Sequence, residues 1–318
     1  MHILLYGAGV LGSYLAHALV RGGNDVTVLA RGKRVAELQN DGIVLRHYLQ
    51  RRTTIDKVNV ISTLQSGEVY DLIFVVMPYS DLPAVLPVLA ENQSRHIVFV
   101  GNNADASATQ RYLKENSAVE KQVAFGFQFS GGWRESGRVV CVRGGGQMEL
   151  GGLDGDLSWR PLLEKAFEHA HYKLVFSADI DSWLKSHMIP VLVLCYASCA
   201  GNGDLRKATG DKELLNHIME AFDEGYKVLE ALDYTLIPAS QAQFVRKRRH
   251  LVSLFLKVFA VTPIAKLVDP LALSQVDEMV ALHHVFDTLK QQANLSTPHW
   301  DALASYIQTL QAHDPMAG

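Results

Sequence analysis

The sequence predicts an α/β domain with a mainly parallel sheet over residues 1–178, followed by an all-α domain over residues 179–318. Apolar runs of strand length occur at residues 3–6, 72–76 and 97–100, and a segment with helical spacing follows each of them. From residue 181 onward, apolar residues recur only at helical spacing. Alternating strands and helices are typical of a parallel sheet with helices on both faces, so we place the domain border near residue 178.

The first apolar run passes directly into a glycine motif, Gly7-x-Gly9-x-x-Gly12. At this spacing the first glycine permits a tight turn, the second lets the backbone approach a pyrophosphate, and the third lets the helix pack closely on the strand. The following helix offers its N-terminal N–H groups and the positive end of its dipole to the phosphates. We therefore expect a dinucleotide to bind at the six residues of this turn, which are Gly7, Ala8, Gly9, Val10, Leu11 and Gly12.

The glycine motif lies within a complete β-α-β unit. A helical segment with Leu11, Leu15 and Leu19 on one face follows the turn, and Val26–Leu29 has the pattern of a second strand. This context is typical of a Rossmann domain, which we expect at the N-terminus. The alternative is a glycine turn in another kind of α/β protein.

The end of the second strand bears on the choice between NAD and NADP. NAD-binding units usually have Asp or Glu there, for the 2′-hydroxyl of the ribose. Here Arg31, Lys33 and Arg34 follow the strand, whereas the nearest carboxylate, Asp25, precedes it. The guanidinium of Arg31 can clamp a 2′-phosphate with two hydrogen bonds, and Lys33 or Arg34 adds charge. We expect NADP as the cofactor; the alternative is that these cations are a solvated start of the next helix.

The remaining elements extend the first domain and build the second. Short strands separated by glycine turns, at residues 123–129, 138–142 and 147–150, predict an antiparallel extension, and residues 173–176 predict a last strand. In the second domain we expect five helices, at residues 181–200, 211–232, 239–260, 274–293 and 298–312. Sites in such pairs usually lie in the cleft between the domains, so we expect the second domain to serve substrate binding and dimerisation.

The composition is that of an ordinary globular protein. Of 318 residues, 48% are hydrophobic and 20% charged, and the net charge of −3 argues against a dedicated nucleic-acid binder. Cys141, Cys195 and Cys199 are odd in number and indicate a reducing compartment; we interpret the last two as core residues, and we expect no bound metal. No signal peptide or apolar stretch of membrane-spanning length is recognised, so we expect a cytoplasmic protein without a membrane partner.

Several local motifs resemble those of the ketopantoate reductase family. They are the Gly-Ala-Gly-x-x-Gly turn, Arg31 after the second strand, the strand-plus-asparagine segment 98–102, the glycines between residues 126 and 151, and a Trp-x-Lys within residues 181–185. The similarity covers nearly the whole chain. It implies a two-domain oxidoreductase that reduces a 2-keto acid with NADPH, as ketopantoate is reduced to pantoate in pantothenate biosynthesis.

The resemblance also implies roles for individual residues. Lys185 corresponds to the family's general acid, and its ammonium group can stabilise and protonate the oxygen that gains charge during hydride attack. Asn202 corresponds to an asparagine that holds the substrate, and Asn102 can reach the nicotinamide ribose or the substrate. Glu278 corresponds to a catalytic carboxylate near both. The alternatives are a surface lysine, a turn asparagine before Gly203, and an exposed glutamate on a helix.

The positions that would recognise a keto acid depart from the family pattern. Pro78 stands near a position where the family often has a lysine, Ile189 stands in place of an asparagine, and residues 264–269 lack a Ser-x-x-x-Asp-type segment. Replacing polar groups that bind the substrate is costly, so we expect a substrate shell different from the family's. Two alternatives stay open: an NADP-binding sensor or interaction protein without catalysis, and a dehydrogenase that acts on another carbonyl substrate.

A basic run at residues 246–250 directly precedes an apolar run at residues 251–256. Such a pair can contact anionic lipid, nucleic acid or an acidic substrate. We favour the interpretation that it is a solvated helix turn ahead of a core helix or of a dimer face. The last of these would make the protein a homodimer.

Overall fold

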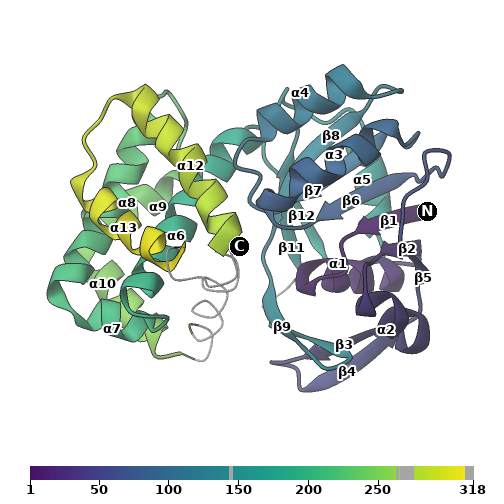
Figure 1. The fold of residues 1–318 in the computed structure, drawn as a ribbon, viewed down its shortest axis with the longest axis horizontal. Helices are drawn as coiled ribbons and strands as arrows, with labels where there is room; N and C mark the ends of the chain where they lie inside the picture. The colour runs from purple at the N-terminus through teal and green to yellow at the C-terminus, as the bar shows by residue number, and fades with distance from the viewer. Residues whose placement is uncertain (143–145, 263–264, 266–275, 312–318) are drawn as a thin grey trace. The chain divides into compact units, whose positions relative to one another are not determined.

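A computed structural model of the chain describes residues 1–142, 146–262, 265 and 276–311, with side chains up to residue 307. The chain divides into two compact units, Met1–Ile180 and Asp181–Gly318. The first unit contains all the strands of the described residues together with helices, and the second contains only helices (Figure 1). The predicted α/β and all-α halves are thereby confirmed.

An eight-stranded sheet forms the centre of the first unit, in the order β12-β11-β8-β7-β6-β1-β2-β5. The six strands from β8 to β5 are parallel; β11 pairs antiparallel with β8, and β12 pairs parallel with β11. Their bounds are β1 (His2–Tyr6), β2 (Asp25–Leu29), β5 (Asn59–Ile61), β6 (Leu72–Val76), β7 (His96–Val100), β8 (Gln122–Gln128), β11 (Gln147–Gly151) and β12 (Lys173–Phe176). Strands β1 and β6 lie at the middle and are almost wholly buried, which explains their unbroken apolar sequences.

The connections around β1 and β6 define where a ligand can bind. Helix α1 (Val10–Arg21) connects β1 to β2, whereas α3 (Leu82–Glu91) and α4 (Ala106–Asn116) connect β6, β7 and β8 in the opposite direction along the sheet. Right-handed crossovers in opposite directions place α1 on one face and α3 and α4 on the other. The chain therefore diverges between β1 and β6, and ligands of such sheets bind beyond the carboxyl ends of these strands.

A second sheet packs on α1, in the order β4-β3-β10-β9. Its strands are β3 (Ile43–His47), β4 (Arg52–Asp56), β9 (Gly131–Glu135) and β10 (Arg138–Val142). Asp56 anchors β4 to α1, since its carboxylate lies 2.5 Å from Nδ1 of His17 and 2.6 Å from Nε of Arg21. Burial works to raise the pKa of Asp56, but these two partners hold it below its ordinary value.

This second sheet corrects the predicted antiparallel extension. Residues 123–129 belong to β8, which continues the parallel sheet, and residues 138–142 pair with β3 and β9. Of the three segments, only 147–150, within β11, extends the main sheet in the antiparallel sense. The prediction failed here because β10 pairs with a strand that lies about ninety residues earlier in the sequence.

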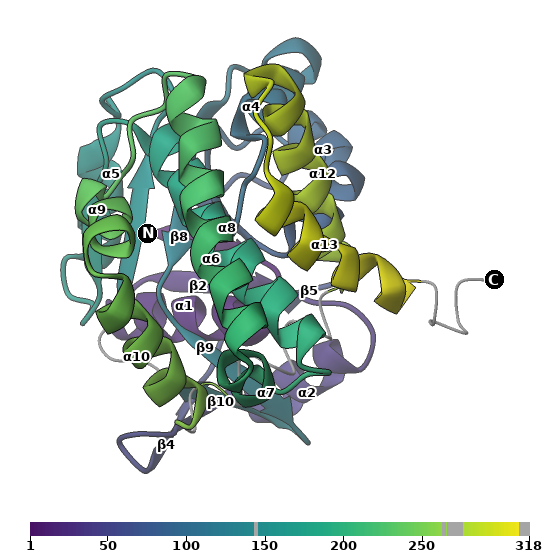
Figure 2. The ribbon, with the colours of Figure 1, turned by 90° about the vertical axis from the view of Figure 1, so that its left-hand side faces the viewer.

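The helices of the second unit are α6 (Ile180–Ala200), α7 (Leu205–Gly210), α8 (Lys212–Ala231), α9 (Ala239–Lys247), α10 (Arg249–Ala260), α12 (Val276–Ala293) and α13 (Pro298–Gln311). Helix α8 contacts α7, α9, α10, α12 and α13 and is the centre of the unit (Figure 2). Gly225 of α8 makes this packing possible, because a Cβ there would lie 2.9 Å from atoms of Ile189 and Trp300. Helix α6 is long and apolar enough to cross a membrane, but most of it is buried, as in core helices of soluble proteins.

The single helix predicted over residues 239–260 is two helices. At Arg248 the backbone leaves the helical conformation, with φ −130° and ψ 38°. The break lets α9 pack on α8 while α10 packs on α7, which one straight helix would not do. Helix α7 was not predicted from the sequence; its six residues are too few to display a periodic pattern.

Candidate functional site

The glycine turn of the first unit has the geometry of a pyrophosphate-binding loop. Gly7 has φ +124°, and a Cβ there would lie 2.2 Å from the carbonyl oxygen of Val76. A Cβ on Gly12 would lie 1.9 Å from the carbonyl oxygen of Gly7, so α1 can approach β1 only with glycine at this position. In contrast, nothing lies within 4 Å of a Cβ built on Gly9. The space beside Gly9 suits a group that the chain itself does not supply.

A cavity of about 390 Å³ opens beside this turn, at the carboxyl ends of β1 and β2. Tyr6 and Gly7 to Gly9 form one wall, and Leu29 to Arg31 form another. No side chain caps the N-terminus of α1, which leaves that end of the helix to an anion. The cavity, the glycines and the helix end together fit the phosphates of a dinucleotide cofactor.

The three cations after β2 have different environments. Arg31 lines the cavity, is exposed, and donates a hydrogen bond from Nη2 to Oη of Tyr6 at 3.3 Å. Arg34 also lines it but is buried, and it donates to Glu37 at 2.9 Å and to Ser13 at 3.2 Å. Lys33 is exposed and is not among the lining residues. Arg31 is therefore the best placed of the three to contact an incoming phosphate, and Arg34 mainly ties α2 (Lys33–Asp41) to α1.

Two charged lining residues were missed from the sequence. Arg134 of β9 reaches the cavity, and its Nη2 lies 3.0 Å from Oε2 of Glu37. Asp81, at the end of the 3₁₀ turn Tyr79–Asp81, adds a carboxylate. The hydrogen bond from Arg34 and the nearby charge of Arg134 hold the pKa of Glu37 below its ordinary value. No local signal identifies Arg134, because it comes from the second sheet, about a hundred residues after Arg31.

Two consecutive asparagines follow β7, and the second has a structural role. Asn103, with φ +35°, is buried and donates from Nδ2 to the carbonyl oxygens of Phe99, Gly101 and Gly126 at 3.0–3.3 Å. Asn102 is half-buried at the carboxyl end of the strand, the edge of the sheet at which such folds bind ligands.

In the second unit, Lys185 lies in the second turn of α6 and is buried, with 6% of its surface exposed. Its Nζ lies 2.5 Å from Oδ1 of Asp181, one helical turn earlier, and 5.0 Å from the centre of the Tyr234 ring. Trp183 is buried and stacks on His187 with ring centroids 5.0 Å apart. The environment of Lys185 is thus not that of a surface lysine, because a carboxylate and an aromatic face hold its ammonium group in place.

The length of α6 separates Asn202 from Lys185. Helix α6 continues to Ala200, and Asn202 lies in the turn after it, exposed and with φ +55°. The fifteen residues from Lys185 to the end of α6 at Ala200, at 1.5 Å per residue, span about 22 Å along the helix axis. The backbone N–H of Asn202 donates to the carbonyl oxygen of Cys199 at 2.9 Å, and Asp204 then caps α7. The structure therefore does not bring Asn202 beside Lys185, because α6 runs unbroken through Pro190.

Glu278 is in the first turn of α12 and is 5% exposed. Glu278 is therefore not an exposed glutamate on a helix surface. A carboxylate in the first turn of a helix interacts favourably with the positive end of the helix dipole. Its neighbour Asp277 is exposed.

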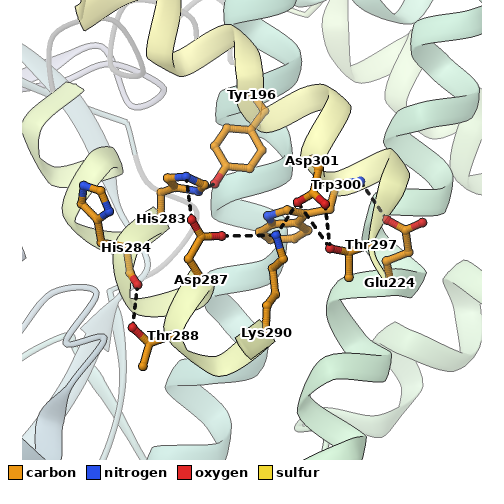
Figure 3. A network of polar contacts seen from close by, with 10 residues as sticks. All are labelled: Tyr196, Glu224, His283, His284, Asp287, Thr288, Lys290, Thr297, Trp300 and Asp301. Atoms are coloured by element: carbon orange, nitrogen blue, oxygen red, sulfur yellow. Dashed lines mark hydrogen bonds and ion pairs between the residues drawn. The ribbon is translucent and has the colours of Figure 1, made fainter. Parts of the chain in front are cut away.

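A polar network holds α12 to α6 and α13 (Figure 3). The hydroxyl of Tyr196 lies 2.8 Å from Nδ1 of His283, and Nε2 of His283 lies 3.2 Å from Oδ2 of Asp287. Lys290 pairs with both Asp287 and Asp301. Burial lowers the pKa of His283 and raises that of Tyr196 well above its ordinary value, so both stay neutral near pH 7. The network anchors the helix that begins beside Glu278.

The departures from the family pattern are also visible in the structure. Pro78 directly precedes the 3₁₀ turn after β6, and Ile189 is fully buried on α6. Residues 264 and 266–269 lie outside the described residues. The three cysteines are buried and form no disulfide with one another. The described part of the chain holds no group of three or more His, Cys, Asp or Glu arranged to bind a metal.

Comparisons with known proteins agree with this architecture. Residues 3–155 match a family model described as "Ketopantoate reductase PanE/ApbA". No curated protein matches the sequence. The chain is similar in structure to 2-dehydropantoate 2-reductase from Methylococcus capsulatus, with a TM-score of 0.75 and 18% identity over 98% of this chain and 97% of that chain.

Two further solved structures show the same fold. A ternary structure of D-mandelate dehydrogenase with NADH and anilino(oxo)acetate has a TM-score of 0.75 and 15% identity over 98% of this chain and 99% of that one. A dimeric ketopantoate reductase from Staphylococcus aureus has a TM-score of 0.69 and 14% identity over 98% and 99%. At these identities the likeness extends to the fold, and the fold includes both units.

Proposed function

Because residues 3–155 match the ketopantoate reductase PanE/ApbA family model, we propose that the protein is an NADP-dependent reductase that converts a 2-keto acid into a 2-hydroxy acid. The observation that carries this proposal is the buried Lys185, held by Asp181 and Tyr234. A protonated amine in such a place suits a reaction in which negative charge develops on a carbonyl oxygen.

In the proposed reaction, separate residues donate the proton, position the donor and contact the ligands. When bound, NADPH supplies the hydride that reduces the carbonyl carbon. The ammonium group of Lys185 donates a hydrogen bond to the carbonyl oxygen, and then its proton, so that the product is a neutral hydroxyl. Asp181 acts as a positioning residue that holds the ammonium group until substrate binds. We place Glu278 and Asn102 at the nicotinamide ribose and the substrate, and we leave Asn202 out because of its distance from Lys185.

Residues of the first unit support the preference for NADP. Arg31 and Arg134 line the cavity beside the glycine turn from two sides. Two guanidinium groups match the charge and the geometry of a 2′-phosphate. The carboxylate of Asp81 would favour the ribose hydroxyl of NAD. Three arginines, Arg31, Arg34 and Arg134, line the same cavity and give it an excess of positive charge.

Two observations bear on the identity of the substrate. Reduction of ketopantoate in pantothenate biosynthesis is the family's reaction, but Pro78 and Ile189 stand near or in place of polar residues. D-Mandelate dehydrogenase has the same fold and was solved with an aromatic oxo acid, anilino(oxo)acetate. We therefore include larger and aromatic 2-keto acids among the candidate substrates. We also expect a cytoplasmic homodimer, as the reductase from Staphylococcus aureus is dimeric.

The test is NADPH oxidation with a panel of 2-keto acids that includes ketopantoate and phenylglyoxylate. With the best substrate, Lys185→Ala should lower turnover by about 10²–10⁴-fold. NADPH binding should be unchanged, because the dinucleotide cavity belongs to the first unit. Lys207→Ala, which removes an exposed lysine of α7, is the matched control and should retain full turnover.

A second candidate function is an NADP-binding sensor without catalysis. The apolar residues Pro78 and Ile189 favour it, because they remove groups that would pair with a keto acid. It predicts tight NADPH binding without oxidation by any member of the panel. Turnover that depends on Lys185 would exclude the sensor, whereas equal turnover of the wild type and of Lys185→Ala would refute the proposed mechanism.

A further inference from the structure

Helix α10 has apolar side chains on two opposite faces. One face is buried in the second unit and consists of Val252, Leu256 and Ala260. The opposite face, together with the residue directly after the helix end, is 49–65% exposed and consists of Leu251, Leu254, Phe255, Val258 and Val261. At 100° per residue these five side chains form one continuous line, which we call the α10 stripe. Phe244 of α9 is a further exposed aromatic residue close in sequence, at 46%.

Cations flank the stripe, and the segment of chain that carries them contains no carboxylate. Residues 234–268 contain six Lys and Arg and no Asp or Glu, although the whole chain has a net charge of −3. Arg246 and Arg249 pair with acidic residues of α8. Lys247, Arg248 and Lys257 are exposed and have no ion-pair partner among the residues that the structure describes.

The position of these cations within the fold is unfavourable for the isolated protein. Arg248 and Arg249 stand at the N-terminus of α10, where the helix dipole repels positive charge. Five apolar side chains exposed in a line are likewise a larger patch than scattered surface residues make, and such patches mark interaction sites. A partner with an anionic surface and an apolar interior would neutralise these cations and cover the apolar side chains.

We propose that the α10 stripe and its flanking cations dock the protein reversibly on a membrane surface that contains anionic lipid. Helix α10 would lie parallel to the membrane, with Leu254, Phe255 and Val258 at the boundary of head groups and acyl chains. Lys257 lies on the flank of the stripe, where its long side chain can reach lipid phosphates. Lys247 and Arg248 add charge at the start of the helix, and each basic residue near such a surface strengthens binding.

The positive charge beside the stripe favours a lipid surface over a second copy of the chain, and the apolar stripe favours it over a nucleic acid. A second copy of the chain would bring the same acid-free basic segment across the interface, and like charges oppose such a pairing. A nucleic acid would satisfy the cations but would leave an unbroken apolar line against phosphates. An anionic lipid surface offers phosphates to the cations and acyl chains to the apolar stripe. Helix α10 would lie on this surface and would not span the membrane.

The test is co-sedimentation of the full-length protein with lipid vesicles. One set is phosphatidylcholine alone, and the other is phosphatidylcholine with phosphatidylglycerol. We expect binding to the second set only, and weaker binding at high salt. Leu254→Ser with Phe255→Ser, and separately Lys247→Glu with Arg248→Glu, should each weaken binding at least about tenfold. Circular dichroism spectra and melting temperatures close to those of the wild type verify that the variants are folded.

Matched controls change exposed residues of the first unit. Val69→Ser removes an apolar side chain that is 57% exposed, and Arg52→Glu with Lys114→Glu reverses two exposed cations. Both should bind vesicles as the wild type does. Absence of binding to anionic vesicles would overturn the proposal, as would binding that the α10 variants leave unchanged. If sedimentation velocity instead shows a dimer that only the Leu254 and Phe255 variant breaks, and vesicles are not bound, the stripe is a self-association surface and the proposal fails.

Discussion

Arg31 and Lys33 are only two residues apart, yet their environments differ. The guanidinium of Arg31 is at the wall of the dinucleotide cavity, next to the hydroxyl of Tyr6, whereas Lys33 is exposed and outside the cavity lining. A 2′-phosphate in this cavity would therefore meet one cation of the pair and not the other. The two residues make a natural test of cofactor preference.

Arg31→Ala should raise the Kd for NADPH by about 10–100-fold, because it removes charge-assisted hydrogen bonds to the 2′-phosphate. The Kd for NADH should change by less than about threefold, since NADH lacks that phosphate. Lys33→Ala is the control and should leave both constants unchanged. Fluorescence titration of the reduced cofactors measures all four values. An equal loss of NADPH and NADH affinity in Arg31→Ala would contradict the assignment of NADP.

At the scale of elements, the orientation of α12 depends on polar contacts that no helical pattern contains. Tyr196 of α6 and Asp287 of α12 contact opposite nitrogens of the buried His283 ring. Trp300 of α13 donates its backbone N–H to Glu224 of α8 at 2.8 Å (Figure 3). The contacts of His283 join α6 to α12, and that of Trp300 joins α13 to α8.

His283→Phe should destabilise the protein by about 2–3 kcal/mol, because it leaves the Tyr196 hydroxyl buried without this partner. Adding Tyr196→Phe should restore part of that loss, because both polar partners are then removed together. His284→Phe changes the exposed neighbour of His283 and should alter stability by less than about 0.5 kcal/mol. Denaturant unfolding of the four proteins measures the differences. A double variant less stable than the single one would show that the hydroxyl makes other important contacts.

At the scale of the whole molecule, several buried or half-buried imidazoles make stability depend on pH. Burial lowers the pKa of His187 to about 4, and it also lowers the pKa of His283 and His96. These rings are neutral in the folded protein, whereas in the unfolded chain they gain protons below about pH 6.5. The unfolded state therefore binds more protons as the pH falls, and it is stabilised relative to the folded state. Asp56 and Asp223, with lowered pKa values, add a further loss below about pH 4.

The melting temperature should change little between about pH 7 and pH 8 and should fall between about pH 6.5 and pH 4. His187 alone accounts for about 1–2 kcal/mol of this loss at pH 5. His187→Phe keeps a ring beside Trp183 and should flatten the pH dependence, whereas His169→Phe, at an exposed position, should not. Melting curves across this pH range measure the dependence of the melting temperature on pH. If His187→Phe leaves that dependence unchanged, the contribution of the His187 ring is refuted.

The sequence of this protein was informative wherever a function depends on neighbours in the chain. The turn from Gly7 to Gly12 and the position of Arg31 could be predicted because strand, turn and helix are consecutive. The cavity lining contributed by Asp81 and Arg134 could not, because these residues come from a later turn and from another sheet. The break at Arg248 was missed for a similar reason, since α9 packs on α8 whereas α10 packs mainly on α7.

The sequence by itself determined the two-part architecture and the glycine turn, because each of these is a local pattern of spacing and polarity, and the family resemblance singled out Lys185. Only the tertiary structure decided that Lys185 is buried beside Asp181 and Tyr234, that Asn202 lies at the far end of α6, and that α10 exposes an apolar stripe. The physical reason is that burial and ion pairing depend on which elements meet in space. Apolar periodicity identifies helical faces, but it does not determine which of two apolar faces the fold covers.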